Sequence, residues 1–427
     1  MSGLVIIGVV VVAYAAVARS LDRLSITAPL VLMLTGLLLG PGAADLLNEQ
    51  VTAEPIKIVA ELALAIILFT DASTISVRSA KSQASMASRL LFIGSLLTIA
   101  LGTLLAHLVL PSLSWAACAL IASILAPTDA ALGLAVVTSP SVPAGVRDAL
   151  NIESGLNDGL VTPFVGFFLA LTLAQDTHGH WTRSIRELAI AVGVGVGVGW
   201  LLGVLGGAAK RRDLMTPSSS ELFVLAAGLL SYTISLASHA NGFVGVYVAG
   251  FAFAAGSRGL LRKDLGLVED TGLFGSFAVW LVFGAFLLGP VLRQFGAGNW
   301  RVLLYAALSL TIIRMLPVAL ALIGSKLQRV SVAFMGFFGP RGLASVVFSI
   351  LMIDALPKDS STGTLVQVAA WTIALSVVIH GLSSGPLSAR YGRAMAGIGA
   401  DAPEMLTGIP APPRRRSLNQ SRWAEDG

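Results

Sequence analysis

The sequence predicts an all-α polytopic membrane protein. Of the 427 residues, 55% are hydrophobic and only 12% are charged, and the mean hydropathy is +0.84. A soluble domain would carry roughly twice that share of charged residues. The apolar residues gather in thirteen segments that can cross a bilayer, some only with tilt. In chain order the segments are residues 3–18, 25–41, 57–74, 88–110, 114–138, 150–174, 187–207, 220–238, 241–256, 271–291, 299–323, 331–353 and 363–386. Twelve is the alternative count, because the second and ninth segments are short.

The positions of the basic residues set the orientation of these segments. The formal net charge is +5, and there are 28 Lys and Arg residues. If the N-terminus lies outside, 20 of them fall on the inward side and two lie within segments. The remaining six are Lys57, Arg183, Arg186, Arg293, Arg301 and Lys358 on the outward side. This asymmetry predicts an outside N-terminus and a cytoplasmic C-terminus, and it explains the basic charge without nucleic acid.

Two of the thirteen segments are interrupted in the middle. The fifth contains Ala126-Pro127-Thr128-Asp129-Ala130, and the twelfth contains Gly336-Phe337-Phe338-Gly339-Pro340-Arg341-Gly342. Proline removes a backbone donor and disfavours helix for the residue before it. Such discontinuous helices are the best sequence indication of a transporter site. The breaks lie seven segments apart, which favours an inverted repeat of segments 1–6 onto 8–13, with segment seven as a linker.

The sixth segment begins with a polar stretch, Asn151 to Gly159. An ionisable residue at membrane depth costs roughly 2.5–3.5 kcal/mol, so it survives mainly beside a partner, a cavity or an ion. Ser154 and Asp158 are four residues apart and share one helix face, and Glu153 and Asn157 share the adjacent face. One face can therefore hold an ion while the other contacts a partner. The alternative is the polar mouth of a helix that Asn151 caps.

Together these motifs resemble the monovalent cation:proton antiporter-1 family, the bacterial NhaP and eukaryotic NHE type of sodium or potassium/proton antiporter. The resemblance runs from about Leu4 to Pro386. It implies an NhaA/NapA-like fold with two crossing discontinuous helices. It also implies a core of about residues 88–174 and 299–386, with the remainder as scaffold and dimer surface. The motifs that carry it are Thr128-Asp129, Glu153-Ser154, Asn157-Asp158 and Gly339-Pro340-Arg341-Gly342.

The transmembrane antiporter domain is accordingly expected over residues 1–393. Residues 394–427 contain prolines and the basic triplet Arg414-Arg415-Arg416 without an apolar period. We expect this segment to be a cytoplasmic tail that is mostly disordered. The basic triplet would face anionic lipid.

Asp158 is the expected titrating carboxylate. Burial raises the pKa of a carboxyl group and a bound cation lowers it, so a proton and a cation compete for one group. Thr128 and Ser154 offer hard oxygen ligands that suit an alkali cation, Na⁺, Li⁺ or K⁺, beside Asp158. Asp129 would either join this cation and proton site or cap the second half-helix. Asp71, after Leu68-Phe69-Thr70, would line a cytoplasmic vestibule or simply lie at the membrane interface.

The resemblance also assigns two roles beside the ion. It implies that Glu153 and Arg341 form a buried structural ion pair. Asn157 stands where electrogenic relatives carry an Asp, so the resemblance implies electroneutral one-for-one exchange. We expect Asn157 to form a hydrogen bond across the crossing. Glu61 and Arg314 are buried ionisable residues without an assignment, and pairing within the core is the default.

Other functions fit the sequence less well. Gly381-Leu382-Ser383-Ser384-Gly385 matches the G-x-S-x-G motif of serine hydrolases, but here it ends a spanning helix instead of forming a strand-to-helix turn. A passive cation channel and a non-transport membrane protein are the alternatives. We therefore predict a secondary transporter of the bacterial inner membrane, not an enzyme. It is expected to need no cofactor, to contact lipid, to form a homodimer and to bind no nucleic acid.

Overall fold

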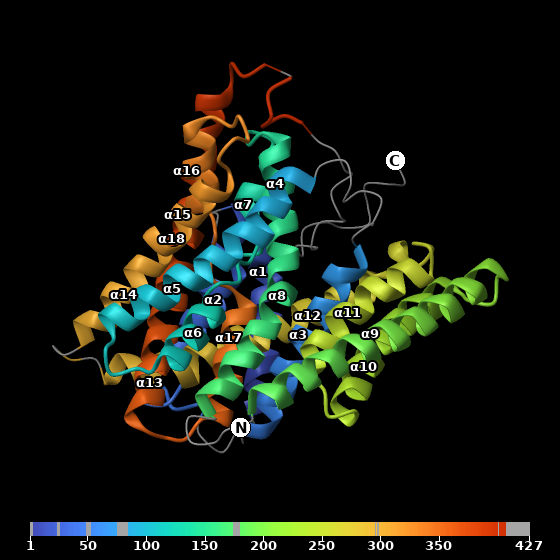
Figure 1. Cartoon of the computed structure of the whole chain (residues 1–427), viewed down its shortest axis with the longest axis horizontal. Coiled ribbons are helices and arrows are strands. Elements are labelled where there is room, and N and C mark those ends of the chain that lie inside the picture. Colours follow the sequence, from blue (N-terminus) through green and yellow to red (C-terminus); the bar gives the residue numbers. More distant parts are fainter. Residues whose placement is uncertain are drawn as a thin grey trace.

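The computed structural model describes residues 3–23, 26–47, 53–74, 84–173, 180–294, 296, 299–399 and 401–406. Every regular element among these residues is a helix (Figure 1). Seven helices of the described part are long and apolar enough to cross a membrane by themselves. Each predicted apolar segment coincides with one helix or with consecutive helical pieces. The all-α class is confirmed, and the count of thirteen spans stays a prediction.

One group of helices packs around α3 and α11, and we call this group the scaffold. In it α11 packs on α9 and α3, and α12 packs on α3 and α2. Its elements are α1 (Gly3–Arg23), α2 (Ala28–Leu39), α3 (Ala53–Thr74), α9 (His180–Arg211), α10 (Pro217–Ala237), α11 (Gly242–Gly256), η3 (Arg262–Asp264), α12 (Gly266–Val282), η4 (Phe283–Leu288) and α13 (Gly289–Arg293). Figure 1 shows α9, α10 and α11 side by side at one end of the molecule.

A second group contains both interrupted helices, and we call it the core. Here α5 packs on α6, α6 on α8, and α14 on α18. Its elements are α4 (Ala84–Ser88), η2 (Arg89–Gly94), α5 (Ser95–Val109), α6 (Trp115–Ile124), α7 (Leu134–Thr138), α8 (Ala144–Leu173), α14 (Trp300–Leu310), α15 (Ile312–Ala321), α16 (Arg329–Phe337), α17 (Leu343–Ala355) and α18 (Ser360–Met395). Helix α8 borders the scaffold, where it contacts α3, α9 and α11.

Close helix packing in the scaffold depends on glycine. A Cβ atom added at Gly195, Gly199 or Gly203 of α9 would overlap the backbone of α11. At Gly193 and Gly197, on another face of α9, an added Cβ would meet nothing within 4 Å. Small residues on one face allow two helix backbones to approach closely. Part of the glycine-rich stretch in segment seven therefore serves packing within the chain.

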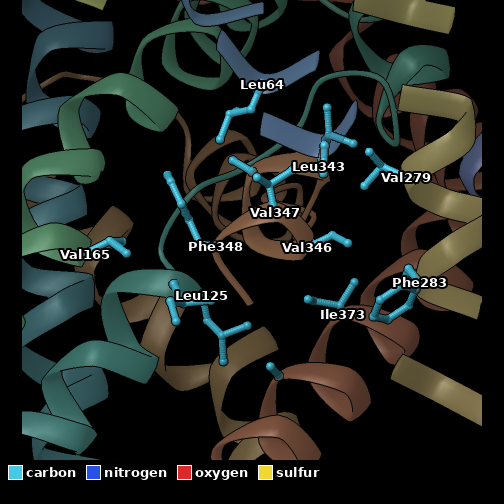
Figure 2. Packing of buried hydrophobic residues seen from close by; sticks show 14 of the residues in the cluster. Leu64, Leu125, Val165, Val279, Phe283, Leu343, Val346, Val347, Phe348 and Ile373 are labelled. Carbon is cyan, nitrogen blue, oxygen red and sulfur yellow. The ribbon is translucent and has the colours of Figure 1, made fainter. Parts of the chain in front are cut away.

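Helix α17 lies at the centre of the largest hydrophobic cluster. Its residues Val346, Val347 and Phe348 are almost fully buried and are surrounded by side chains from α3, α8, α12 and α18 (Figure 2). A helix that is apolar all round has no face suited to water, so it takes a central position. Helix α17, the second half of the interrupted segment 331–353, is thereby packed between the scaffold and the core.

The beginning of the expected tail takes a defined position in the described part of the chain. Helix α18 continues to Met395, and residues 401–406 pack against the beginnings of α8 and α16. The Glu404 carboxylate is buried, where it accepts hydrogen bonds from Gln328 N at 2.8 Å and from Ser331 Oγ at 2.9 Å. A buried carboxylate needs such hydrogen-bond donors. The order of this segment depends on these polar contacts, which a search for an apolar period in the sequence does not detect. Residues 407–427, with the basic triplet, lie outside the described residues.

Candidate functional site

The two helix breaks meet at the middle of the core. Helix α6 ends at Ile124 and α7 begins at Leu134, while α16 ends at Phe337 and α17 begins at Leu343. The amide of Asp129 donates a hydrogen bond to the carbonyl of Pro340 at 2.9 Å. Backbone groups that a break releases need new partners in an apolar interior. Here the two breaks supply a partner for each other.

Asp129 joins the breaks through its side chain as well. Its Oδ1 accepts from the amide of Ala131 at 2.8 Å, and its Oδ2 accepts from the amide of Leu343 at 3.2 Å. The second bond places a carboxylate at the N-terminus of α17, where the helix dipole favours negative charge. Asp129 therefore caps the opposite broken helix, whereas the sequence suggested a cap for the half-helix that follows Asp129 itself. Gly342 is required at this point, because a Cβ there would overlap the Asp129 side chain.

Four of the predicted site residues gather on α8 and the first break. The Thr128 hydroxyl lies 3.2 Å from the Ser154 hydroxyl and accepts a hydrogen bond from Asn157 Nδ2 at 2.6 Å. Asn157 therefore bonds across to the break, as expected. Its Oδ1 is buried and has no hydrogen-bond partner among the described residues. Asp158 is only 4% exposed and follows Ser154 by one turn of α8. This group presents several oxygens and one buried carboxylate.

A second carboxylate stands beside this group. Asp71 lies near the end of α3, and its Cγ is 3.8 Å from where a Cβ on Gly155 would lie. Gly155 is one residue after Ser154, so Asp71 lies next to the helix that carries the predicted ligands. The structure thus brings Asp71 to the site, although it belongs to the scaffold.

The predicted ion pair between Glu153 and Arg341 was wrong. Glu153 pairs with Arg314 of α15 instead, with Nη1 to Oε1 at 2.5 Å and Nη2 to Oε2 at 2.8 Å. Both side chains are almost fully buried, and the two parallel bonds match the planar fork of arginine to the carboxylate. Gly339 makes room for this arrangement, because a Cβ at that position would overlap the Arg314 side chain.

Arg341 has a different role at the crossing. Its Nη1 donates to the carbonyl of Ala126 at 3.1 Å, and its Nη2 donates to the carbonyl of Ser309 at 2.9 Å. Ala126 precedes the proline of the first break, and Ser309 precedes the interruption at Thr311 between α14 and α15. The guanidinium thus binds carbonyls at two helix ends, where a positive charge complements the dipoles.

Helix α18 contributes two side chains to the second break that the sequence motifs do not indicate. The Ser376 hydroxyl accepts from the amide of Arg341 at 2.7 Å and lies 3.2 Å from His380 Nδ1. The other ring nitrogen of His380 lies 2.9 Å from the carbonyl of Phe337. One turn of α18 therefore contacts both edges of the second break. The sequence showed a histidine and a serine four residues apart, but it gave no indication of what they face.

The fold and the site together define a class of protein. Crossed interrupted helices with buried carboxylates and hydroxyls at their meeting point are typical of secondary transporters. Residues 7–390 match the family described as "Sodium/hydrogen exchanger, transmembrane". The chain belongs to this family, and it is a cation/proton antiporter and not an enzyme.

Individual relatives agree with this assignment. The chain is 24% identical over 400 residues to a Na⁺/H⁺ antiporter of Schizosaccharomyces pombe, a match that covers 82% of each protein. It is 25% identical over 273 residues to the K⁺/H⁺ antiporter NhaP2 of Shewanella baltica, covering 62% of this chain and 46% of that protein.

Solved structures confirm the fold. The sodium proton antiporter MjNhaP1 of Methanocaldococcus jannaschii at pH 8 superposes with a TM-score of 0.76 at 22% identity. That match covers 91% of this chain and 98% of the other.

Proposed function

We propose that the chain exchanges one monovalent cation for one proton and that both compete for Asp158. The observation that carries this proposal is the contact between the first break and α8. It places the Thr128 hydroxyl against Ser154 and Asn157, one turn from the buried Asp158. Hydroxyl, amide and carboxylate oxygens suit a hard alkali cation. We assign Asp129 mainly to capping α17, and we place Asp71 at the vestibule beside Gly155.

Electroneutral exchange is the stoichiometry we propose. Residue 157 is an asparagine, and its amide already donates to Thr128, so Asp158 is the one carboxylate on this part of α8 that alternates between proton and cation. We further propose that the protein forms a homodimer in a bacterial inner membrane, with its N-terminus outside and its C-terminus in the cytoplasm.

Purified protein in liposomes tests the proposal. An imposed pH gradient should drive saturable uptake of Na⁺, Li⁺ or K⁺, and comparing the three ions identifies the substrate. Asp158→Asn keeps the size of the side chain but cannot ionise, so exchange should vanish at every pH. Asp213→Asn is the matched control, because Asp213 is exposed and its positive φ of 55° suits asparagine. Exchange that survives in Asp158→Asn would contradict the role of this carboxylate.

Two further measurements test whether protons and cations compete for one site and whether the exchange moves net charge across the membrane. Raising the proton concentration should raise the apparent KM for the cation roughly in proportion at low pH, with little change in the maximal rate. An imposed membrane potential should leave the rate nearly unchanged. A strong dependence on potential would overturn the electroneutral stoichiometry, and a cation conductance without proton coupling would instead identify a channel.

A further inference from the structure

Helices α8 and α11 run antiparallel along the boundary between core and scaffold. Gly166 of α8 lies beside Asn241, whose Nδ2 is 2.7 Å from where a Cβ on Gly166 would lie. Gly159 lies beside Tyr247. Next along α11, Gly250 packs against Phe69 and Ala72 of α3, on either side of Asp71. Glycines on α8 therefore face scaffold side chains at successive levels.

The packing between α8 and the scaffold is tighter at Gly159 than at Gly155. At Gly155 an added Cβ would meet only the Asp71 carboxylate, at 3.8 Å and 4.0 Å, and Gly155 is partly exposed. At Gly159, one turn and about 6 Å further along α8, an added Cβ would overlap the Tyr247 ring, and Gly159 is buried. Asp158 lies between these levels. The packing beside Asp158 is therefore loose toward Gly155 and tight toward Gly159.

Two contacts hold the Tyr247 side chain in this position, one through its hydroxyl and one through its ring. Its hydroxyl donates to the carbonyl of Leu156 on α8 at 3.0 Å. Its ring packs edge-on against Phe251 of its own helix, with centroids 5.0 Å apart. The hydroxyl bond crosses from scaffold to core, and it ends one residue beyond Gly155 on the helix that carries the cation ligands. A shift of α8 against α11 would break this bond and expose Gly159.

We propose that Tyr247 is the outer barrier of the cation site. This proposal rests on the proposed function and orientation, in which α8 begins at the cytoplasmic side and Gly159 lies outward of Gly155. Alternating access requires the core to move against the scaffold. The contacts of Tyr247 with Gly159 and Leu156 exist only while the outer path is closed, so they favour the inward-facing state by their own interaction energy.

Chemical labelling tests the barrier without depending on transport. Cys118 is the only cysteine, so Cys118→Ser with Ser154→Cys places a single thiol in the site. With Tyr247 intact, an impermeant thiol reagent applied outside should label this cysteine slowly. Tyr247→Ala should raise the external labelling rate at least tenfold and leave the cytoplasmic rate unchanged. An unchanged external rate, or a rise only from the cytoplasmic side, would overturn the proposal.

Matched variants separate the barrier from general loosening. Tyr247→Phe keeps the ring but loses the bond to Leu156, so external labelling of the single cysteine should rise only several-fold. In the chain that keeps Ser154, Tyr247→Phe should leave the exchange coupled to protons. This variant decides the question if Tyr247→Ala does not fold. Tyr232→Phe is the control, because the Tyr232 hydroxyl bonds Glu61 of α3 within the scaffold. An equal rise in Tyr232→Phe would refute the assignment to Tyr247. Loss of exchange in Asp158→Asn is a separate result, because labelling does not require exchange.

Discussion

Removing one charge from the Glu153–Arg314 pair should strongly destabilise the core. The two residues share two hydrogen bonds of 2.5 Å and 2.8 Å, and their side chains are only 1% and 2% exposed. Breaking a buried pair by removing one partner typically costs about 3–5 kcal/mol, because the other charge stays buried. Glu153→Gln and Arg314→Gln should each reduce the ratio of folded to unfolded protein by roughly 100-fold or more.

The Lys210–Asp264 pair offers a control in the same chain. Its atoms are 2.9 Å apart, but the lysine side chain is 32% exposed and the aspartate 12%. Pairs that water reaches typically contribute about 0–1 kcal/mol. Asp264→Asn should therefore cost much less than Glu153→Gln. Unfolding in mixed micelles with increasing SDS, followed by the fluorescence of the seven tryptophans, measures both.

A double-mutant cycle then identifies the partner of Glu153. Combining Glu153→Gln with Arg314→Gln should cost clearly less than the sum of the single changes. Combining Glu153→Gln with Arg341→Gln should be closer to additive, because Arg341 donates to the carbonyls of Ala126 and Ser309. Strong coupling to Arg341 and additivity with Arg314 would refute the pairing described above.

Two further changes address the crossing of the breaks. Asp129→Asn keeps one oxygen acceptor for the amides of Ala131 and Leu343. Asp129→Ala leaves both amides without an acceptor, which costs about 1–3 kcal/mol of stability for each amide. Asp129→Asn should therefore retain more stability and more exchange than Asp129→Ala. Complete loss of exchange in a stable Asp129→Asn would place this residue among the cation ligands. Gly342→Ala should lower the folded yield, because the new methyl group overlaps Asp129, whereas Gly363→Ala in α18 meets open space and should be neutral or stabilising. Equal yields in the same expression test would contradict the close contact at Gly342.

The sequence predicted the parts of this protein that depend on one segment at a time. Long apolar runs require helices in a membrane, and Pro127 and the Gly339-Pro340 pair each prevent a continuous helix. The spacing of Ser154 and Asp158 places both on one face of α8 by helical geometry. These local rules led to the class, the two breaks and most of the candidate ligands.

Only the tertiary structure decided which residues meet across helices. Arg314 and Arg341 are both buried arginines, and either could have paired with Glu153. The choice depends on the interruption at Thr311 and on the space beside Gly339, which direct Arg314 to the carboxylate and Arg341 to two carbonyls. Tyr247 and His380 likewise act on elements far away in the chain. Helical periodicity determines the face of a residue, but its partner depends on the rotation, shift and kinks of the neighbouring helices, which no single segment records.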